Sequence, residues 1–225
     1  MLFRSAWRRF VRLARAGRLH PDVVLYVHLP FCAKVCSYCL LASERAPSSA
    51  ARERYVAALE RQAAGYAEIL DGLPIGALHV GGGTPTLLRA DLLDRVLTAT
   101  RAFARAPGFD AGIEAHPSTI TERKLEVLAA HGIDRVSIGI ESFTPAVLER
   151  AHRGDQTLER VRRAIARMRA SGIRRINADL LAGLPGETLA TFEETVRLAA
   201  SLDVDSLSVN RYLAERSPLA SFGYR

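Results

Sequence analysis

Residues 23–39 read VVLYVHLPFCAKVCSYC, an apolar, β-branched run that stops at a proline and continues into a cysteine-rich loop. The run from Val23 to Leu29 predicts a buried strand, because short apolar stretches bounded by turn residues are typical of sheet interiors. The loop after it contains every cysteine of the chain, Cys32, Cys36 and Cys39, in the spacing C-x3-C-x2-C. In parallel α/β folds the residues that follow the strands face the ligand, so this loop is the first candidate for a functional site.

The same unit, a short apolar run followed by a stretch with helical spacing, recurs along the chain. Strands are predicted at Val23–Leu29, Ala77–Val80, Ala111–His116, Arg135–Ile140, Ile173–Leu181 and Ser206–Asn210. Helices are predicted at Arg52–Leu70, Ala90–Arg105, Thr121–His131, Thr144–His152, Leu158–Ser171 and Leu189–Leu202. Strands that alternate with helices form a parallel sheet, because parallel neighbours need a crossover connection. The fold class is therefore α/β, and either a doubly wound sheet or a complete or partial (β/α) barrel satisfies the pattern.

Glycines mark the ends of some of these helices. Gly108, Gly132 and Gly172 each follow a helical pattern and precede a predicted strand, which is the place of a C′ glycine. Gly81, Gly82 and Gly83 follow the second predicted strand, where consecutive glycines let the backbone approach a ligand.

The composition of the 225-residue chain narrows the class of protein. Hydrophobic residues make up 48% and charged residues 24%, which is typical of a globular chain, and no apolar window approaches the roughly 18 residues of a membrane span. Clustered cysteines in an odd number exclude a secreted disulfide scaffold. The net charge of +7 reflects an arginine-rich composition with only Lys34 and Lys124 as lysines, and we do not assign it to nucleic-acid binding. We expect a soluble, cytoplasmic protein without a nucleic-acid partner.

Residues 1–22 carry the densest basic charge. Trp7, Phe10 and other apolar residues recur there at helical spacing among six arginines, which predicts an N-terminal basic amphipathic helix. A helix that packs Trp7 and Phe10 on the body of the protein is favoured over an arm that binds a membrane surface or a partner.

Three thiols in one loop indicate a metal centre. Cysteine thiolates hold [4Fe-4S] clusters, and a cluster with only three protein ligands leaves one iron open to another ligand. A structural zinc site is the alternative, but it needs four ligands, and His28 is the one further ligand near the loop. The spacing is atypical of zinc knuckles and favours the cluster, while zinc stays open.

Five motifs extend the pattern: YVHLPFC at 26–32, GGGTPT at 81–86, IEAHP at 113–117, RVSIGIESF at 135–143 and DLLAGLPGET at 179–188. With the cysteine spacing they resemble the radical S-adenosylmethionine (SAM) superfamily, in the branch of oxygen-independent coproporphyrinogen III oxidases. Relatives in that branch include heme chaperones and class C radical SAM methyltransferases. The resemblance implies a partial (β/α)6 TIM-like barrel of parallel strands, with residues 23–225 as the radical SAM core domain and the usual C-terminal domain absent.

The resemblance also implies roles for particular residues. A [4Fe-4S] cluster would be held by Cys32, Cys36 and Cys39 and would act with one or two molecules of SAM. The residues implied in cofactor binding are Tyr26, Tyr38, Gly82, Gly83, Thr84 and Glu114. Those implied for a second SAM or the substrate are Glu141, Arg153 and Asp179, and Glu141 stands where the oxidases usually have glutamine. No residue is assigned as catalytic, and three histidines are interpreted as packed residues rather than ligands: His28, His79 and His116, with His79 directed inward.

The implied reaction is reductive cleavage of SAM at the cluster to a 5′-deoxyadenosyl radical, followed in the oxidases by oxidative decarboxylation of a tetrapyrrole. The chain departs from those oxidases at Leu40 and Leu41, which follow Cys39 where a further cysteine is usual. The alternatives are a class C radical SAM methyltransferase of secondary metabolism, a non-catalytic heme chaperone and, from a different class, a zinc-binding structural module. The implied partners are a small-molecule substrate, tetrapyrrole or other, and a reductant such as flavodoxin or ferredoxin.

Overall fold

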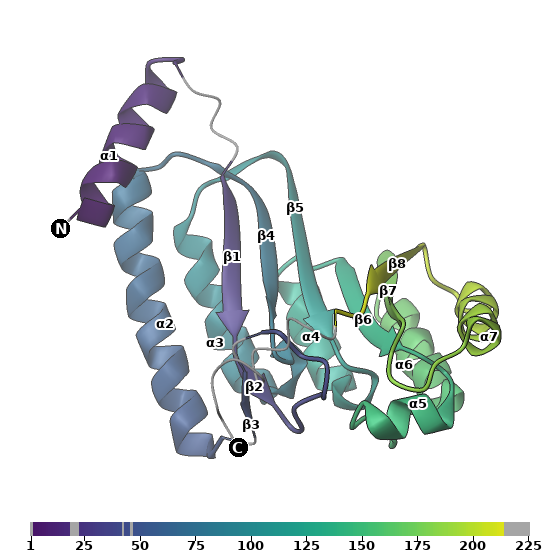
Figure 1. Ribbon diagram of the computed structural model, residues 1–225. Helices are drawn as coiled ribbons and strands as arrows, with labels where there is room; N and C mark the ends of the chain where they lie inside the picture. Colours follow the sequence, from purple (N-terminus) through teal and green to yellow (C-terminus); the bar gives the residue numbers. More distant parts are fainter. Residues whose placement is uncertain (1, 19–22, 42, 46, 214–225) are drawn as a thin grey trace.

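A curved parallel sheet forms the centre of the protein (Figure 1). The computed structural model describes residues 2–18, 23–41, 43–45 and 47–213. The sheet contains six strands: β1 (Val24–Leu29), β4 (Ile75–Gly82), β5 (Arg105–Ala115), β6 (Arg135–Glu141), β7 (Arg175–Ala182) and β8 (Ser206–Arg211). Each strand pairs in parallel with the next in chain order. A doubly wound sheet reverses this order at its switch point, so the order observed confirms the partial barrel.

Helices connect the strands, as the sequence predicts. They are α2 (Ser49–Leu70), α3 (Ala90–Ala99), α4 (Glu122–Ala130), α5 (Pro145–Arg150), α6 (Leu158–Ala170) and α7 (Leu189–Ala200). Short 3₁₀ turns are η1 (Pro85–Leu87), η2 (Thr100–Ala102) and η3 (Pro117–Thr119). Side-chain caps start several helices: Ser48 accepts a hydrogen bond from the Ala51 amide, and Thr157 accepts one from the Arg160 amide. A separate parallel pair, β2 (Phe31–Cys32) with β3 (Glu44–Arg45), holds the start of the cysteine loop.

One predicted helix end is wrong. Gly108 does not follow a helix, because α3 ends at Ala99, η2 adds one turn, and Gly108 lies within β5 with φ +76°. The chain becomes extended at Phe103, which is 4% exposed, and Pro107 cannot continue a helix. Burial of an aromatic side chain thus overrides the helical pattern that continues to Arg105.

Alternation along the strands separates the core from the site. In β6, Val136, Ile138 and Ile140 are fully buried in the core cluster beneath the helices. The intervening residues Ser137, Gly139 and Glu141 line the cavity on the other side of the sheet. Because side chains of a strand alternate between its two faces, one strand supplies both the core and the site.

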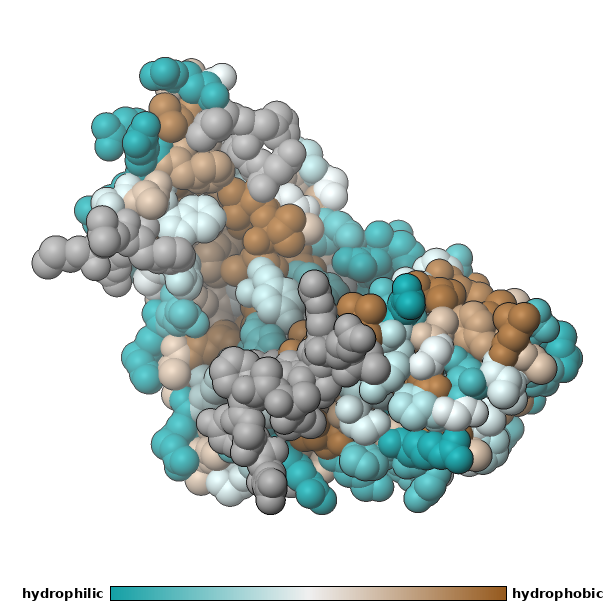
Figure 2. All heavy atoms as spheres, viewed as in Figure 1, coloured by the Kyte–Doolittle hydropathy of each residue, from teal (hydrophilic) through white to brown (hydrophobic). Residues whose placement is uncertain are grey.

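Helix α1 (Leu2–Arg15) packs on the body of the protein. Val11 is buried in a cluster with Ala63 and Leu70 of α2, and Trp7 and Phe10 pack against the same cluster. This confirms the predicted packing of the amphipathic helix. Figure 1 places α1 at the end of the sheet opposite the cysteine loop, and in Figure 2 hydrophilic side chains cover its outer side. In the part of the chain that the structure describes, no helix is long and apolar enough to cross a membrane.

Candidate active site

The carboxyl ends of the strands enclose a cavity of about 790 Å³. Nearly all the residues that the resemblance implies line it: Cys32, Cys36, Tyr38, Cys39, Gly82, Gly83, Thr84, Glu114, Glu141, Arg153 and Asp179. Tyr26 is the exception, because it is half exposed, stacks on His79 at 5.9 Å between ring centroids and bonds His28 Nδ1 at 3.1 Å. The structure therefore brings together every predicted site residue but one.

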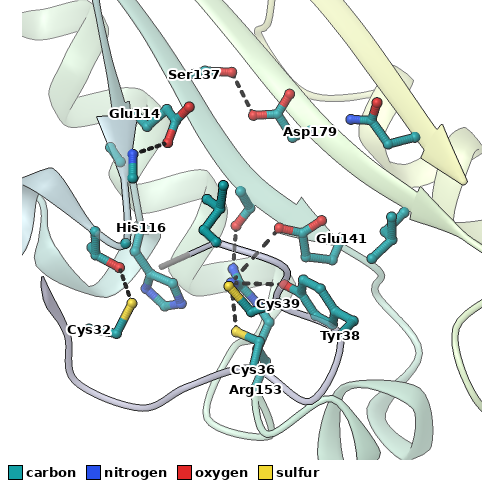
Figure 3. Close-up of a pocket in the computed structure, with 18 of the residues that line it drawn as sticks. Cys32, Cys36, Tyr38, Cys39, Glu114, His116, Ser137, Glu141, Arg153 and Asp179 are labelled. Carbon is teal, nitrogen blue, oxygen red and sulfur yellow. Dashed lines mark hydrogen bonds and ion pairs between the residues drawn. The ribbon is translucent and has the colours of Figure 1, made fainter. Parts of the chain in front are cut away.

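The cysteine loop forms one wall of the cavity (Figure 3). The thiols of Cys32, Cys36 and Cys39 are free, with Cys32 buried and the other two partly buried. Burial raises the pKa of Cys32 and of Cys39, and the neighbouring thiols raise both further. Each thiol is thus harder to ionise beside the others, and a cationic centre would stabilise all three as thiolates.

The glycine turn after β4 packs directly on this loop. A Cβ atom added to Gly83 would lie 2.8 Å from Cys32 Sγ and 2.8 Å from the Phe31 carbonyl oxygen. Gly82 has φ +116°, and a Cβ atom there would lie 2.8 Å from the Leu29 carbonyl oxygen. Thr84 Oγ1 lies 4.0 Å from Cys32 Sγ. The glycines are therefore needed for the close approach of the turn to the cysteine loop, a packing role beside the predicted approach to a ligand.

Glu114 is fixed on the opposite side of the glycine turn. Its Oε2 accepts a hydrogen bond from the Gly82 amide at 3.1 Å, and its Oε1 lies 3.1 Å from His79 Nε2. His79 lines the cavity from β4, with 29% of its side chain exposed. The sequence did not predict that His79 lies beside the carboxylate of Glu114. The strand register explains this position: His79 pairs with Gly112, and Glu114 lies two residues further along β5.

Arg153 connects the cysteine loop to the end of β6. Its Nη1 lies 3.8 Å from Cys36 Sγ and 3.4 Å from the Tyr38 hydroxyl, and its Nη2 donates to Gln156 Oε1 at 2.8 Å. Gln156 is 4% exposed and donates in turn to the carbonyl oxygens of Ile140 and Ser142. Sequence reasoning missed Gln156, because a glutamine three residues after an arginine gives no signal of burial.

Glu141 ends β6 in an unusual conformation. Its φ of +65° is rare for a residue with a side chain, and the strand register shifts between Gly139 and Glu141. Burial raises the pKa of Glu141, and Arg153, whose Nη1 is 3.9 Å away, opposes the rise. The kink turns the carboxylate toward the cavity, where Figure 3 shows it facing Arg153 and Tyr38.

A network of polar side chains on β6, β7 and β8 lines the part of the cavity farthest from β1. Asp179 accepts hydrogen bonds from Ser137 at 2.5 Å and from the Asn177 amide at 2.8 Å. Asn177 Oδ1 accepts from Ser206 at 2.8 Å and Ser208 at 3.1 Å. The two hydroxyl donors fix the direction of the amide, and burial raises the pKa of Asp179.

His116 lines the cavity as a neutral imidazole. Burial and the nearby Arg153 charge lower its pKa to about 3. Its Nδ1 accepts a hydrogen bond from the Ser118 amide at 3.2 Å and lies 2.8 Å from Ser118 Oγ. The proton is therefore on Nε2 at neutral pH.

The donor set fits an iron–sulfur cluster better than a single zinc ion. Among the described residues no three His, Cys, Asp or Glu side chains are arranged to hold one metal ion. His28 Nδ1 bonds the Tyr26 hydroxyl, so the fourth ligand considered for zinc is not joined to the thiols. A cluster binds each thiolate to a different iron, and Cys32, Cys36 and Cys39 line the same cavity, as such a cluster requires.

Comparison with known proteins agrees with this geometry. Residues 26–199 match the family model described as the Radical SAM superfamily. An oxygen-independent coproporphyrinogen III oxidase of Paracoccus denitrificans is 33% identical over 192 residues, which cover 84% of this chain and 42% of the relative. The heme chaperone HemW of Bacillus subtilis is 31% identical over 193 residues, which cover 84% of this chain and 50% of that protein. The chain thus spans half the length of these curated relatives or less.

A solved structure shares the architecture. The coproporphyrinogen III oxidase HemN from Escherichia coli, a radical SAM enzyme, matches with a TM-score of 0.81 at 31% identity, covering 92% of this chain and 48% of the other. The family match takes in the cysteine loop, the glycine turn and the strand-end carboxylates that surround the cavity. This chain belongs to the radical SAM superfamily.

Proposed function

We propose that this protein is an enzyme that cleaves SAM reductively at a [4Fe-4S] cluster held by Cys32, Cys36 and Cys39. When bound and reduced by an external one-electron donor such as flavodoxin or ferredoxin, the cluster would supply the electron for cleavage of the S–C5′ bond of SAM to methionine and a 5′-deoxyadenosyl radical, which would take a hydrogen atom from the substrate. The observation that carries the proposal is that the three thiols, the glycine turn and Glu114 face one cavity.

The residues of the glycine turn and β5 suit the first SAM. Gly82 and Gly83 bring bare backbone to the edge of the cysteine loop, where an added Cβ atom would clash with Leu29, Phe31 and Cys32. Both oxygens of Glu114 already accept one hydrogen bond, and each keeps a lone pair for a hydroxyl or ammonium group of SAM. His79 and the Gly82 amide hold this carboxylate in place.

Glu141, Arg153 and Asp179 suit a second ligand, either substrate or another SAM. Asp179 lies on β7, two strands from Glu114 on β5, so these two of the carboxylates that line the cavity occupy separate positions. We propose an oxidation like that of the coproporphyrinogen oxidases as the main reaction. The two carboxylate positions also favour a second candidate, methyl transfer that uses two molecules of SAM.

Product analysis tests these proposals. Anaerobically reconstituted protein is mixed with dithionite and SAM, and mass spectrometry follows 5′-deoxyadenosine and S-adenosylhomocysteine. The proposal predicts 5′-deoxyadenosine, and S-adenosylhomocysteine in addition would favour methyl transfer. Stoichiometric heme binding with no 5′-deoxyadenosine would contradict the proposal and favour a heme carrier like the HemW relative.

A further inference from the structure

Arg153 is a buried cation with incomplete compensation. Only 6% of the residue is exposed, and a buried charge is costly unless it is paired. The carboxylate it faces, Glu141, lies 3.9 Å from Nη1, which is a long ion pair. Its Nε is buried and has no hydrogen-bond partner within the described part of the chain. The site therefore lacks some of the negative charge that would balance this guanidinium.

One terminal nitrogen of Arg153, Nη1, contacts the cysteine loop. Nη1 lies within 3.8 Å of Cys36 Sγ and 3.4 Å of the Tyr38 hydroxyl, and Figure 3 shows these interactions converging on the guanidinium. Gln156 holds Nη2 from the opposite side at 2.8 Å, and the Gly139 carbonyl oxygen accepts from the same nitrogen. Arg153 is thus held in one orientation, with its charge against a predicted cluster ligand.

A thiolate at Cys36 would supply the missing charge. Reduction adds one more negative charge to the group that Cys36 binds, so a buried guanidinium at hydrogen-bond distance stabilises the reduced state more than the oxidised state. Hydrogen bonds to cluster sulfurs and the local net charge are among the factors that set cluster potentials. Glu141 in its ionised form, close to the same guanidinium, acts in the opposite direction.

We propose that Arg153 is a charge-compensating residue of the cysteine loop that makes one-electron reduction of the cluster easier. This role rests on the proposed function, since it needs a cluster on Cys36, and it is distinct from contact with a second ligand. Gln156 is the positioning residue that holds the guanidinium in place.

The midpoint potential of the reconstituted cluster, measured by EPR-monitored redox titration without SAM or substrate, tests this role. Arg153→Met is expected to lower the equilibrium constant for reduction by about tenfold, which corresponds to about 59 mV for one electron. Arg153→Lys keeps a charge and is expected to lose less. Glu141→Gln removes the opposing carboxylate and is expected to shift the potential the other way.

Arg163→Met is the matched control, because Arg163 is exposed on α6 and pairs with Glu159 at 3.5 Å. Its potential is expected to equal that of the wild type. A fully loaded Arg153→Met protein with the wild-type potential overturns the proposal, and so does Glu141→Gln shifting in the same direction as Arg153→Met.

A second variant covers the case in which Arg153→Met does not fold or load. Gln156→Leu keeps the charge but releases Nη2, and it is expected to lower the potential by a smaller amount. An unchanged potential in loaded Gln156→Leu overturns the proposal. A wild-type protein that takes up no iron and sulfide contradicts the proposed function instead, so iron analysis separates the two failures.

Discussion

Gly83 has no room for a side chain, and this gives a test at the scale of one residue. In Gly83→Ala the new Cβ would lie 2.8 Å from Cys32 Sγ and from the Phe31 carbonyl oxygen, so the turn must move away from the loop. We expect a loss of about 1–3 kcal/mol in unfolding free energy and reduced iron uptake. Gly76→Ala is the control, since its nearest contact would be 3.9 Å away. Equal iron uptake by the Gly83→Ala and Gly76→Ala variants would contradict the close approach of the glycine turn to the cysteine loop.

The three cysteines give the second residue-scale test. Because a cluster with three protein ligands has none to spare, Cys→Ala at Cys32, Cys36 or Cys39 is expected to abolish cluster loading after anaerobic reconstitution. Iron and sulfide analysis with visible absorption measures this. Ser37→Ala is the control, as the Ser37 hydroxyl donates to the Arg150 carbonyl oxygen and should leave loading unchanged. A single cysteine variant that keeps the full cluster and cleaves SAM would refute the assignment.

The sequence predicted which residues form the site better than it predicted the contacts that these residues make. The thiols, the glycines and Glu114 fall in short motifs, and short motifs can be recognised in the sequence before the fold is known. The contact of Arg153 with Cys36 joins positions 117 residues apart, and no local pattern predicts it. The positive φ of Glu141 likewise depends on how β6 ends against β7.

At the scale of elements, Lys124 of α4 ties together the turns after two strands. Its Nζ donates to the carbonyl oxygens of Thr86 at 2.6 Å and Thr119 at 3.0 Å. Lys124→Met is expected to cost about 1.5–3 kcal/mol in unfolding free energy and to weaken SAM binding, because the glycine turn loses its support. Calorimetric titration of SAM and thermal unfolding measure both effects. Arg123→Met, an exposed neighbour on the same helix, is expected to change neither. Wild-type SAM affinity in Lys124→Met would contradict this coupling.

The elements themselves were largely predictable, because long periodic segments carry their own signal. The strands of the sheet and the helices between them lie where alternation and helical spacing place them. The N-terminal end of β5 was not predictable, since the helical pattern continues to Arg105 and the burial of Phe103 decides against it. The pair β2 with β3 was also missed, because two-residue strands have no periodicity.

At the scale of the whole molecule, the order of the strands decides where the site lies. The sequence left a doubly wound sheet and a barrel open, because the choice depends on contacts between segments and not on any one of them. The six strands of the main sheet follow one another in chain order, from β1 through β4 to β8. The sheet curves around one cavity, where the residues at the strand ends lie together. The chain matches half the length of its curated relatives or less.

EPR spectroscopy of the dithionite-reduced, reconstituted protein with and without SAM tests whether the three cysteines hold a cluster that binds SAM. A cluster with three cysteine ligands has one iron open to SAM. We expect the signal of a reduced [4Fe-4S] cluster whose shape changes when SAM is added. A protein that shows no cluster signal and contains one zinc per chain, or a cluster signal that SAM leaves unchanged, would contradict it.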